Sequence, residues 1–217
     1  MSSAATRPHS GAPRATVVVS GDDVYEDLFA ASAQLQAILT EAGFAARTAL
    51  GTAAADAAGR GSLVVLDTAA GSFDPATQRR LVSAVRAGTG LIAIHSAIVP
   101  GLPAGAELLD AIGARYLDHG PRPHESRFEV ELDAEHEITR GLASFPVTHE
   151  HYRVALSPDA RPIAWRAGDG IREPVSHVKK EGEGRVCYLQ LGHDQGIWGE
   201  PPVRALIARA ARWAVSA

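Results

Sequence analysis

Two histidines in this sequence follow apolar runs, at the places where strands of a sheet would end. His95 comes directly after the run 90–94, and His193 comes after the run 184–191 and one glycine. In open α/β sheets, ligands bind beyond the carboxyl ends of the strands, so both histidines are placed where such sheets carry their chemistry. Imidazole is a ligand of zinc and related divalent metals and a common general acid or base. Backbone and water can also satisfy a histidine at a strand end, so neither residue identifies a site by itself.

A third group of the same chemical type is the His-Glu-His-Tyr sequence at 149–152. Its carboxylate, Glu150, is a candidate acid–base group or metal ligand. Another imidazole, His119, lies in a loop rich in proline and glycine. We expect these groups to converge above the carboxyl edge of the sheet, where they bind a divalent metal such as zinc or act as acid and base without one. The expected ligands are His95, His119, Glu150 and His193.

Ser96 is a candidate nucleophile with a neighbouring histidine as its base. The nucleophile-elbow pattern Gly-x-Ser-x-Gly is missing, because Ile94 and Ala97-Ile98 flank the His95-Ser96 pair. The catalytic candidates are therefore His95, Ser96, Glu150 and His193. Polar residues at other predicted strand ends and turns are candidates for substrate contact, and they are Asp22, Asp67, His119, His151, Tyr152 and Asp194.

Strand and helix patterns alternate over the first hundred residues. Apolar runs predict strands over 15–20, 44–50, 62–67 and 90–94, and helical spacing predicts helices over 25–42 and from Asp74-Pro75 onward. Later segments predict strands over 128–132, 162–166, 173–178 and 184–191, a hairpin turn at 181–184 and a helix over 201–215. We expect an α/β fold: a single-domain flavodoxin-like or Rossmann-like three-layer sandwich with a mostly parallel central sheet over residues 15–217. Residues 1–14 are expected to form a disordered arm.

Composition excludes several classes of protein. The net charge of −4 comes from 25 acidic and 21 basic residues, and these are scattered rather than striped, so we expect no nucleic-acid or membrane partner. The single cysteine, Cys187, excludes an internal disulfide and a cysteine-based metal cluster. No apolar run approaches the roughly 20 residues of a membrane span. The first fifteen residues lack the core of a signal peptide, so we expect a cytoplasmic location.

Two cofactor and partner questions also follow from the sequence. No Gly-x-Gly-x-x-Gly follows the first predicted strand and no Walker loop is present, so we expect no nucleotide cofactor. We expect a small-molecule partner, and the sequence leaves a homo-oligomer open.

Several different motifs follow one another in a characteristic order along the chain. The most specific are Gly-Leu-Ile-Ala-Ile-His-Ser at 90–96 and Gly-Arg-Val-Cys-Tyr-Leu-Gln-Leu-Gly-His at 184–193. The segments 112–116, 136–142 and 149–152, together with Pro174-Val175 and Trp213, complete the series. From about Ala15 onward the chain thereby resembles the ThuA-like (trehalose-utilisation) family. The resemblance implies a fold similar to class I glutamine amidotransferases and a bacterial role linked to oxidised, 3-keto glycosides such as those derived from trehalose.

The sequence departs from this pattern at two positions. The amidotransferase relatives carry a nucleophilic cysteine after the central strand, where this chain has His95-Ser96, and Cys187 lies inside a predicted strand. We therefore expect no glutaminase activity. Family members tend to carry an aromatic residue after Pro174-Val175, where this chain has Ser176-His177. The histidine either joins the pocket rim or changes the surface packing.

Three functions stay open at this point. The first is lyase, hydrolase or isomerase chemistry on a keto-sugar derivative, which needs a base for the proton beside the ketone, an acid for the leaving oxygen and a group that polarises the carbonyl. The second is a non-catalytic sugar-binding or scaffold protein that retains the fold. The third is a hydrolase that depends on Ser96. Metal content separates the first two, and labelling by a fluorophosphonate identifies the third.

Overall fold

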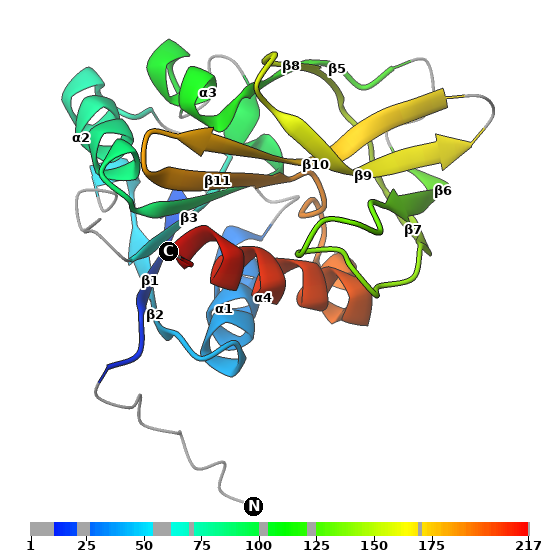
Figure 1. The fold of residues 1–217 in the computed structure, drawn as a ribbon, viewed down its shortest axis with the longest axis horizontal. Coiled ribbons are helices and arrows are strands. Elements are labelled where there is room, and N and C mark those ends of the chain that lie inside the picture. The colour runs from blue at the N-terminus through cyan, green and yellow to red at the C-terminus, as the bar shows by residue number, and fades with distance from the viewer. Residues whose placement is uncertain are drawn as a thin grey trace, which may run out of the picture.

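A nine-stranded sheet forms the centre of the computed structural model, which describes residues 11–20, 27–53, 62–69, 72–99, 104–120, 125–168 and 171–216 (Figure 1). The strand order is β2-β1-β3-β4-β11-β10-β9-β6-β7, and β5 pairs separately with β8. The predicted arm at 1–14 lies mostly outside the described residues. Within the described ranges, no helix has the length and apolar character needed to cross a membrane.

The first half of the sheet is parallel. It contains β1 (Arg14–Ser20), β2 (Ala45–Leu50), β3 (Leu63–Thr68), β4 (Gly90–Ile94) and β11 (Gly184–Leu189), and every pairing among these neighbours is parallel. β3 and β4 are buried along their whole length, as continuous apolar runs in a doubly covered parallel sheet should be. The strands predicted from these runs are confirmed, and Ile92 and Ile94 are completely buried.

The second half of the sheet is antiparallel, so the expectation of a mostly parallel sheet is wrong here. It contains β10 (Ile171–Glu181), β9 (Arg161–Gly168), β6 (Glu125–Leu132) and β7 (Phe145–Glu150). A short connection is the reason for one of the antiparallel pairings: the register pairs Glu181 of β10 with Gly184 of β11, and a two-residue turn can join only antiparallel strands. This turn confirms the predicted hairpin.

Three strands were not predicted from the sequence. They are β7, β5 (Ala114–Asp118) and β8 (Arg153–Leu156), of which the last two pair with each other. β8 alternates exposed with half-buried residues, so it has no continuous apolar run to mark it. β5 contributes one buried residue, Ala114, and its Tyr116 bonds His119 near the site. A charged, half-exposed strand is hard to distinguish from a loop in a single sequence.

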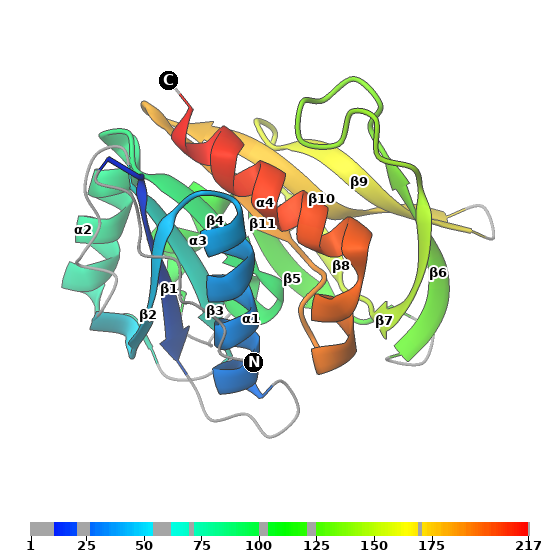
Figure 2. The ribbon, with the colours of Figure 1, turned by 90° about the horizontal axis from the view of Figure 1, so that it is seen from below.

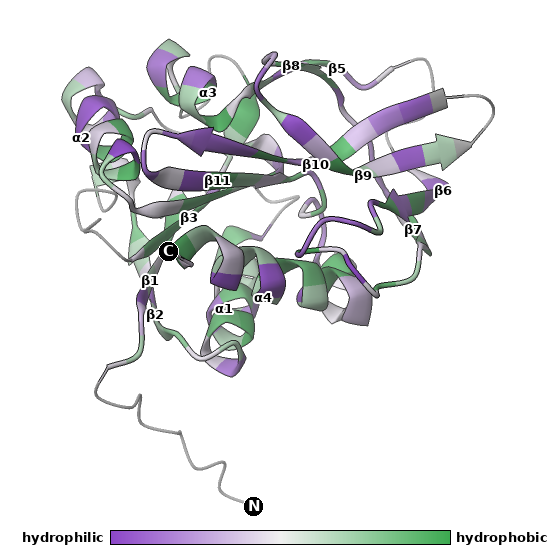
Figure 3. Ribbon diagram, in the orientation of Figure 1, coloured by the Kyte–Doolittle hydropathy of each residue, from purple (hydrophilic) through white to green (hydrophobic). Residues whose placement is uncertain are grey.

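Helices cover both faces of the sheet. α1 (Leu28–Glu41) and α4 (Pro201–Val215) lie on one face, and α2 (Pro75–Arg86) and α3 (Ala106–Ile112) lie on the other (Figures 1 and 2). Alternate residues of the strands supply the two apolar clusters: Val17 packs with α1 and α4, and Val18 packs with α2. Figure 3 accordingly shows hydrophobic residues on the sides of α1 and α4 that face the sheet, whereas β10 carries mostly hydrophilic residues. The helix predicted from Asp74-Pro75 onward is confirmed as α2, and Asp74 caps it by accepting the N–H groups of Ala76 and Thr77.

The antiparallel half curls so that its far edge meets the centre of the sheet. β7 is the last strand in the order, yet Glu150 at its end contacts His95 at the end of β4. Figure 2 shows β6 curving along the side of the molecule opposite α2. This curl places residues from both halves of the sheet at one point above the carboxyl edge of β4.

Candidate functional site

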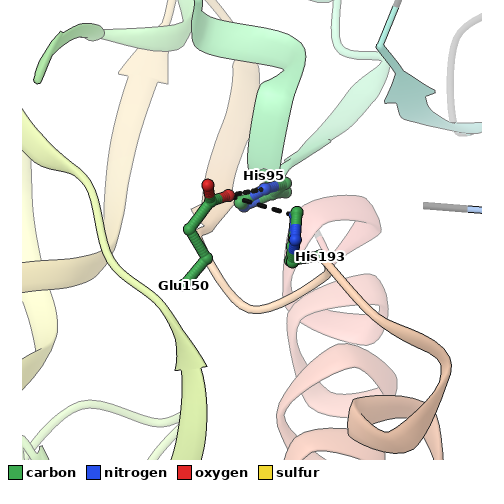
Figure 4. Close-up of side chains that lie close together, drawn as sticks. All are labelled: His95, Glu150 and His193. Carbon is green, nitrogen blue, oxygen red and sulfur yellow. Dashed lines mark ion pairs between the residues drawn. The ribbon is translucent and has the colours of Figure 1, made fainter. Parts of the chain in front are cut away.

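Three imidazole rings surround the carboxylate of Glu150. Its Oε2 lies 2.8 Å from Nε2 of His95 and 3.1 Å from Nδ1 of His193, and its Oε1 lies 2.8 Å from Nε2 of His119. In Figure 4, His95 and His193 point toward the same carboxylate oxygen. The structure therefore brings together all four residues that the sequence marked as metal ligands. Their chemical roles stay predictions.

His95 occupies a strained turn directly after β4. Its φ of +44° lies in the left-handed region, which costs a residue other than glycine of the order of 1–3 kcal/mol. The short helix η2 (His95–Ile98) begins at this residue, and the ring is almost fully buried. Strain of this kind persists where the surrounding structure holds it, and it often marks a functional position.

The hydrogen bonds of His95 fix its proton positions. Nδ1 lies 2.9 Å from the carbonyl oxygen of Gln190, and a carbonyl can only accept, so Nδ1 carries a proton. Nε2 faces the carboxylate of Glu150 and, at 2.9 Å, the hydroxyl of Tyr152. An imidazole lone pair directed at a carboxylate would be repelled. Nε2 therefore needs either a second proton or a cation shared with Glu150.

Glu150 is held in its ionised form. Burial would raise the pKa of this carboxyl, but hydrogen bonds from His193 and His95 outweigh burial and hold the pKa well below its ordinary value. An ionised carboxylate among imidazoles is the donor type that zinc and similar metals bind. One ligand atom from each of His95, Glu150 and His193 lies within 4.8 Å of the other two. Two histidines and one glutamate form a common catalytic zinc set, which leaves a position open for water or substrate.

His119 lies outside that set of three. It contacts the other oxygen of Glu150, and its Nδ1 lies 2.7 Å from the hydroxyl of Tyr116. The four expected ligands therefore divide into three with converging atoms and one that orients the carboxylate from its opposite side. The side chains of His119 and His193 are 28% and 21% exposed, whereas that of His95 is 1% exposed, so solvent reaches the cluster past the first two.

His149 is a member of the cluster that was not among the predicted site residues. Its Nδ1 lies 2.5 Å from the carbonyl oxygen of Glu150, and its Nε2 accepts the backbone N–H groups of Gly192 and His193, both at 3.0 Å. Burial, followed by the nearby His95, lowers the pKa of His149 to about 3, so the ring is neutral. Its place beside Glu150 in the sequence was the only available signal.

Tyr152 contacts the cluster directly, whereas His151 is linked to it through Gln190. The ring of Tyr152 stacks on His95 with a centroid distance of 4.4 Å, as befits a residue of the site. His151 pairs through Nε2 with Glu173, and its Nδ1 lies 3.2 Å from Oε1 of Gln190. Gln190 thus links the two histidines, because its backbone carbonyl bonds His95 and its side chain bonds His151. Sequence reasoning missed both Gln190 and Glu173, since neither has a motif that reveals its partner.

Ser96, Asp67 and Asp194 are the remaining predicted residues that the structure describes. The hydroxyl of Ser96 donates to the carbonyl of Thr68 at 3.1 Å, and Asp194 caps the short helix η3 (Gln195–Gly199) by accepting the N–H of Ile197. Asp67 is buried in β3, where it pairs in register with Ile94 of β4. Asp22 lies outside the described residues.

His177 corrects an expectation, because it lies neither at a pocket rim nor on the surface. The side chain is fully buried and its Nε2 lies 2.9 Å from the carbonyl oxygen of Ile112 at the end of α3. An irregularity in the pairing of β10 with β9 at Ser176 and His177 is the physical reason, since it breaks the alternation on which a sequence-based assignment of faces depends. Cys187 behaves as expected: it is buried in β11, and burial raises the pKa of its thiol to about 12.

Gly192 permits the close approach of the His193 loop to β4. A Cβ at this position would lie 2.5 Å from Cγ2 of Ile94 and 3.3 Å from Cβ of His95. We expect Gly192→Ala to displace the loop, lower the free energy of unfolding by about 2 kcal/mol and weaken metal binding at the cluster. Urea unfolding and zinc titration measure both effects. Gly199→Ala is the control, because a Cβ there meets nothing within 4 Å, and equal stability of the two variants would contradict the prediction.

The fold and the cluster together describe an α/β protein with a mixed sheet and a histidine–glutamate cluster at the carboxyl edge of its parallel half. A family model described as trehalose utilisation (ThuA) matches residues 14–214, so the chain belongs to the ThuA family, as its motifs predicted. This membership supports a carbohydrate-related function.

Solved structures of two ThuA-like proteins share this fold. The protein from Parabacteroides merdae ATCC 43184 is 18% identical, with 94% of this chain and 90% of that chain covered and a TM-score of 0.72. The protein from Bacteroides uniformis ATCC 8492 is 15% identical, with 98% and 95% covered and a TM-score of 0.75. A β-galactosidase from Bacillus circulans sp. alkalophilus is 15% identical over 92% of this chain and 31% of its own, with a TM-score of 0.67. A search of curated proteins gave no match.

Proposed function

We propose that this protein is a metal-dependent enzyme that acts on a keto-sugar derivative, with His95, Glu150 and His193 as the metal ligands. The observation that carries the proposal is the convergence of two imidazoles on one ionised, buried carboxylate. The family supplies the substrate class, because its description is trehalose utilisation.

The donor set fits a divalent cation. Nδ1 of His95 must donate to the Gln190 carbonyl, so Nε2 is the nitrogen that would bind metal, and its position beside Glu150 suits a cation between the two. A hydrogen bond that fixes the tautomer of a histidine ligand is the usual outer support of a metal site. Glu150 receives the same support from His119 through its other oxygen.

Cleavage of a 3-keto glycoside is the reaction that we propose. Loss of the proton at C2, beside the ketone, leaves an electron pair that forms the C1–C2 double bond while the C1–O bond breaks and the leaving oxygen takes up a proton. A bound metal would supply polarisation of the ketone. His119 is suited to exchange a proton with the sugar, since it is partly exposed: Glu150 holds its Nε2, and the sugar would displace the hydroxyl of Tyr116 from its Nδ1.

The finer description of the fold belongs to the same proposal. We propose a single domain over residues 15–217 with a flavodoxin-like core. Support comes from the order β2-β1-β3-β4-β11, which corresponds to the flavodoxin-like order 2-1-3-4-5, and from helices on both faces of these strands.

Metal analysis followed by an activity assay tests the function. We expect the purified protein to bind one zinc or cobalt ion per chain and to cleave a 3-keto derivative of trehalose but not trehalose itself. A chelator should remove the activity, and added zinc should restore it. Absence of both metal and cleavage would favour a sugar-binding or scaffold protein, and fluorophosphonate labelling of Ser96 would favour a serine hydrolase instead.

A further inference from the structure

His149 joins the two chain segments that carry Glu150 and His193. The first segment is the end of β7, and the second is the loop between β11 and η3. The imidazole of His149 is completely buried between them and contacts both through backbone groups. It also contacts the rings of His95 and His193 edge-on, with centroid distances of 5.6 and 6.2 Å.

The hydrogen bonds leave no nitrogen of this ring for a metal or substrate. Nδ1 carries the proton, because its partner is the carbonyl oxygen of Glu150, which can only accept. Nε2 is therefore the acceptor, and its lone pair is shared by the N–H groups of Gly192 and His193. Both residues lie beyond the end of β11 at Leu189, and His149 supplies an acceptor for their two N–H groups.

We propose that His149 is the positioning residue of the site, which sets the distance between Glu150 and His193 by bonding the backbone of both segments. The carboxylate and imidazole of those residues lie 3.1 Å apart, and each sits on a segment that His149 holds directly. A ligand pair preorganised in this way binds a cation without first ordering a loop. This proposal rests on the proposed function for its metal readout only.

Two substitutions of His149 separate its bond to the Glu150 carbonyl from its bonds to the N–H groups of the loop. In His149→Asn, the shorter amide can still donate to the carbonyl of Glu150 but cannot reach the loop. In His149→Gln, the longer amide can place its oxygen where Nε2 lies and accept from Gly192 and His193. His177→Asn is the matched control, because His177 is equally buried and also bonds a backbone carbonyl, but at the end of α3.

The positioning role can be tested without metal by measuring, with NMR, the hydrogen-exchange rates of the Gly192 and His193 amides. We expect protected amides at Gly192 and His193 in the natural protein. His149→Asn should raise their exchange rates at least about tenfold relative to β4, and His149→Gln should restore most of the protection. Zinc affinity, measured by competition with a chelating dye, should fall about 10–100-fold in His149→Asn and recover in His149→Gln. His177→Asn should leave the two amides and the zinc affinity unchanged.

Each outcome decides a separate question. A folded His149→Asn protein with natural exchange rates at both amides, or unprotected amides in the natural protein, overturns the positioning role. Equal loss in the Asn and Gln variants also overturns it, because the role then depends on ring packing rather than on the acceptor. If the natural protein binds no zinc, the proposed metal function fails, and the exchange data still decide the role of His149.

Discussion

Replacing Glu150 with glutamine is expected to abolish cleavage of a keto glycoside and to weaken zinc binding by at least about 100-fold. The carboxylate supplies the only negative charge in the ligand set of His95, Glu150 and His193. It also receives His119 on its second oxygen, so the substitution removes a ligand and leaves three imidazoles without their common acceptor. Zinc titration and the keto-trehalose assay measure the two losses, and circular dichroism reports whether the fold is kept.

Glu181→Gln provides the matched control for that experiment. Glu181 is another largely buried glutamate that pairs with two cationic side chains, Lys179 and Arg86, at the turn after β10. Its replacement should lower stability without changing zinc affinity. Unchanged zinc affinity and turnover in Glu150→Gln would show that the cluster is not the site.

The second large effect concerns stability at mildly acid pH. We expect His177 to account for a fall of about 3 kcal/mol in the free energy of unfolding as the pH decreases from 6.5 toward 4. Burial, the largest cause, lowers the pKa of His177 to about 4, while the unfolded chain keeps the ordinary value near 6.5. Above pH 6.5 both states are neutral and the stabilisation is complete. Below it, the unfolded state binds a proton that the folded state binds only near pH 4, so stability is lost as the pH falls.

Urea unfolding at several pH values, with His177→Asn as the comparison, isolates this contribution. The variant should be less stable than the natural protein at pH 7.5, and the difference should shrink as the pH decreases toward 4. Parallel stability curves for the two proteins would contradict the prediction, because they would assign the pH dependence to other groups.

Sequence reasoning located the parallel half of the sheet because its strands, apart from the edge strand β2, are largely buried on both faces. Runs such as 63–66 and 90–94 are apolar without interruption, and only a doubly covered strand requires that. The same signal fails for β8, whose residues alternate between exposed and half-buried. Its position depends on pairing with β5 across 34 or more intervening residues, and no local pattern encodes that register.

The residues of the candidate site also divide into those that the sequence could predict and those that it could not. His95 and His193 were accessible to prediction because each follows an apolar strand, and the topology brings parallel strand ends together. The roles of His149 and Gln190 were not accessible, since they depend on backbone groups of distant segments that meet only in the folded chain. His119 was predicted as a ligand, and its bond to the second oxygen of Glu150 depends on side-chain directions that spacing cannot give.

The position of β11 has a consequence for the chain during its synthesis. This strand is the last to be made among those described, yet it lies in the middle of the sheet, between β4 and β10. Until residues 184–189 leave the ribosome, β4 presents an open, fully apolar edge and the two halves of the sheet are unjoined. Exposed edges of this type pair readily with other chains. We therefore expect nascent chains that stall before Gly184 to need a chaperone.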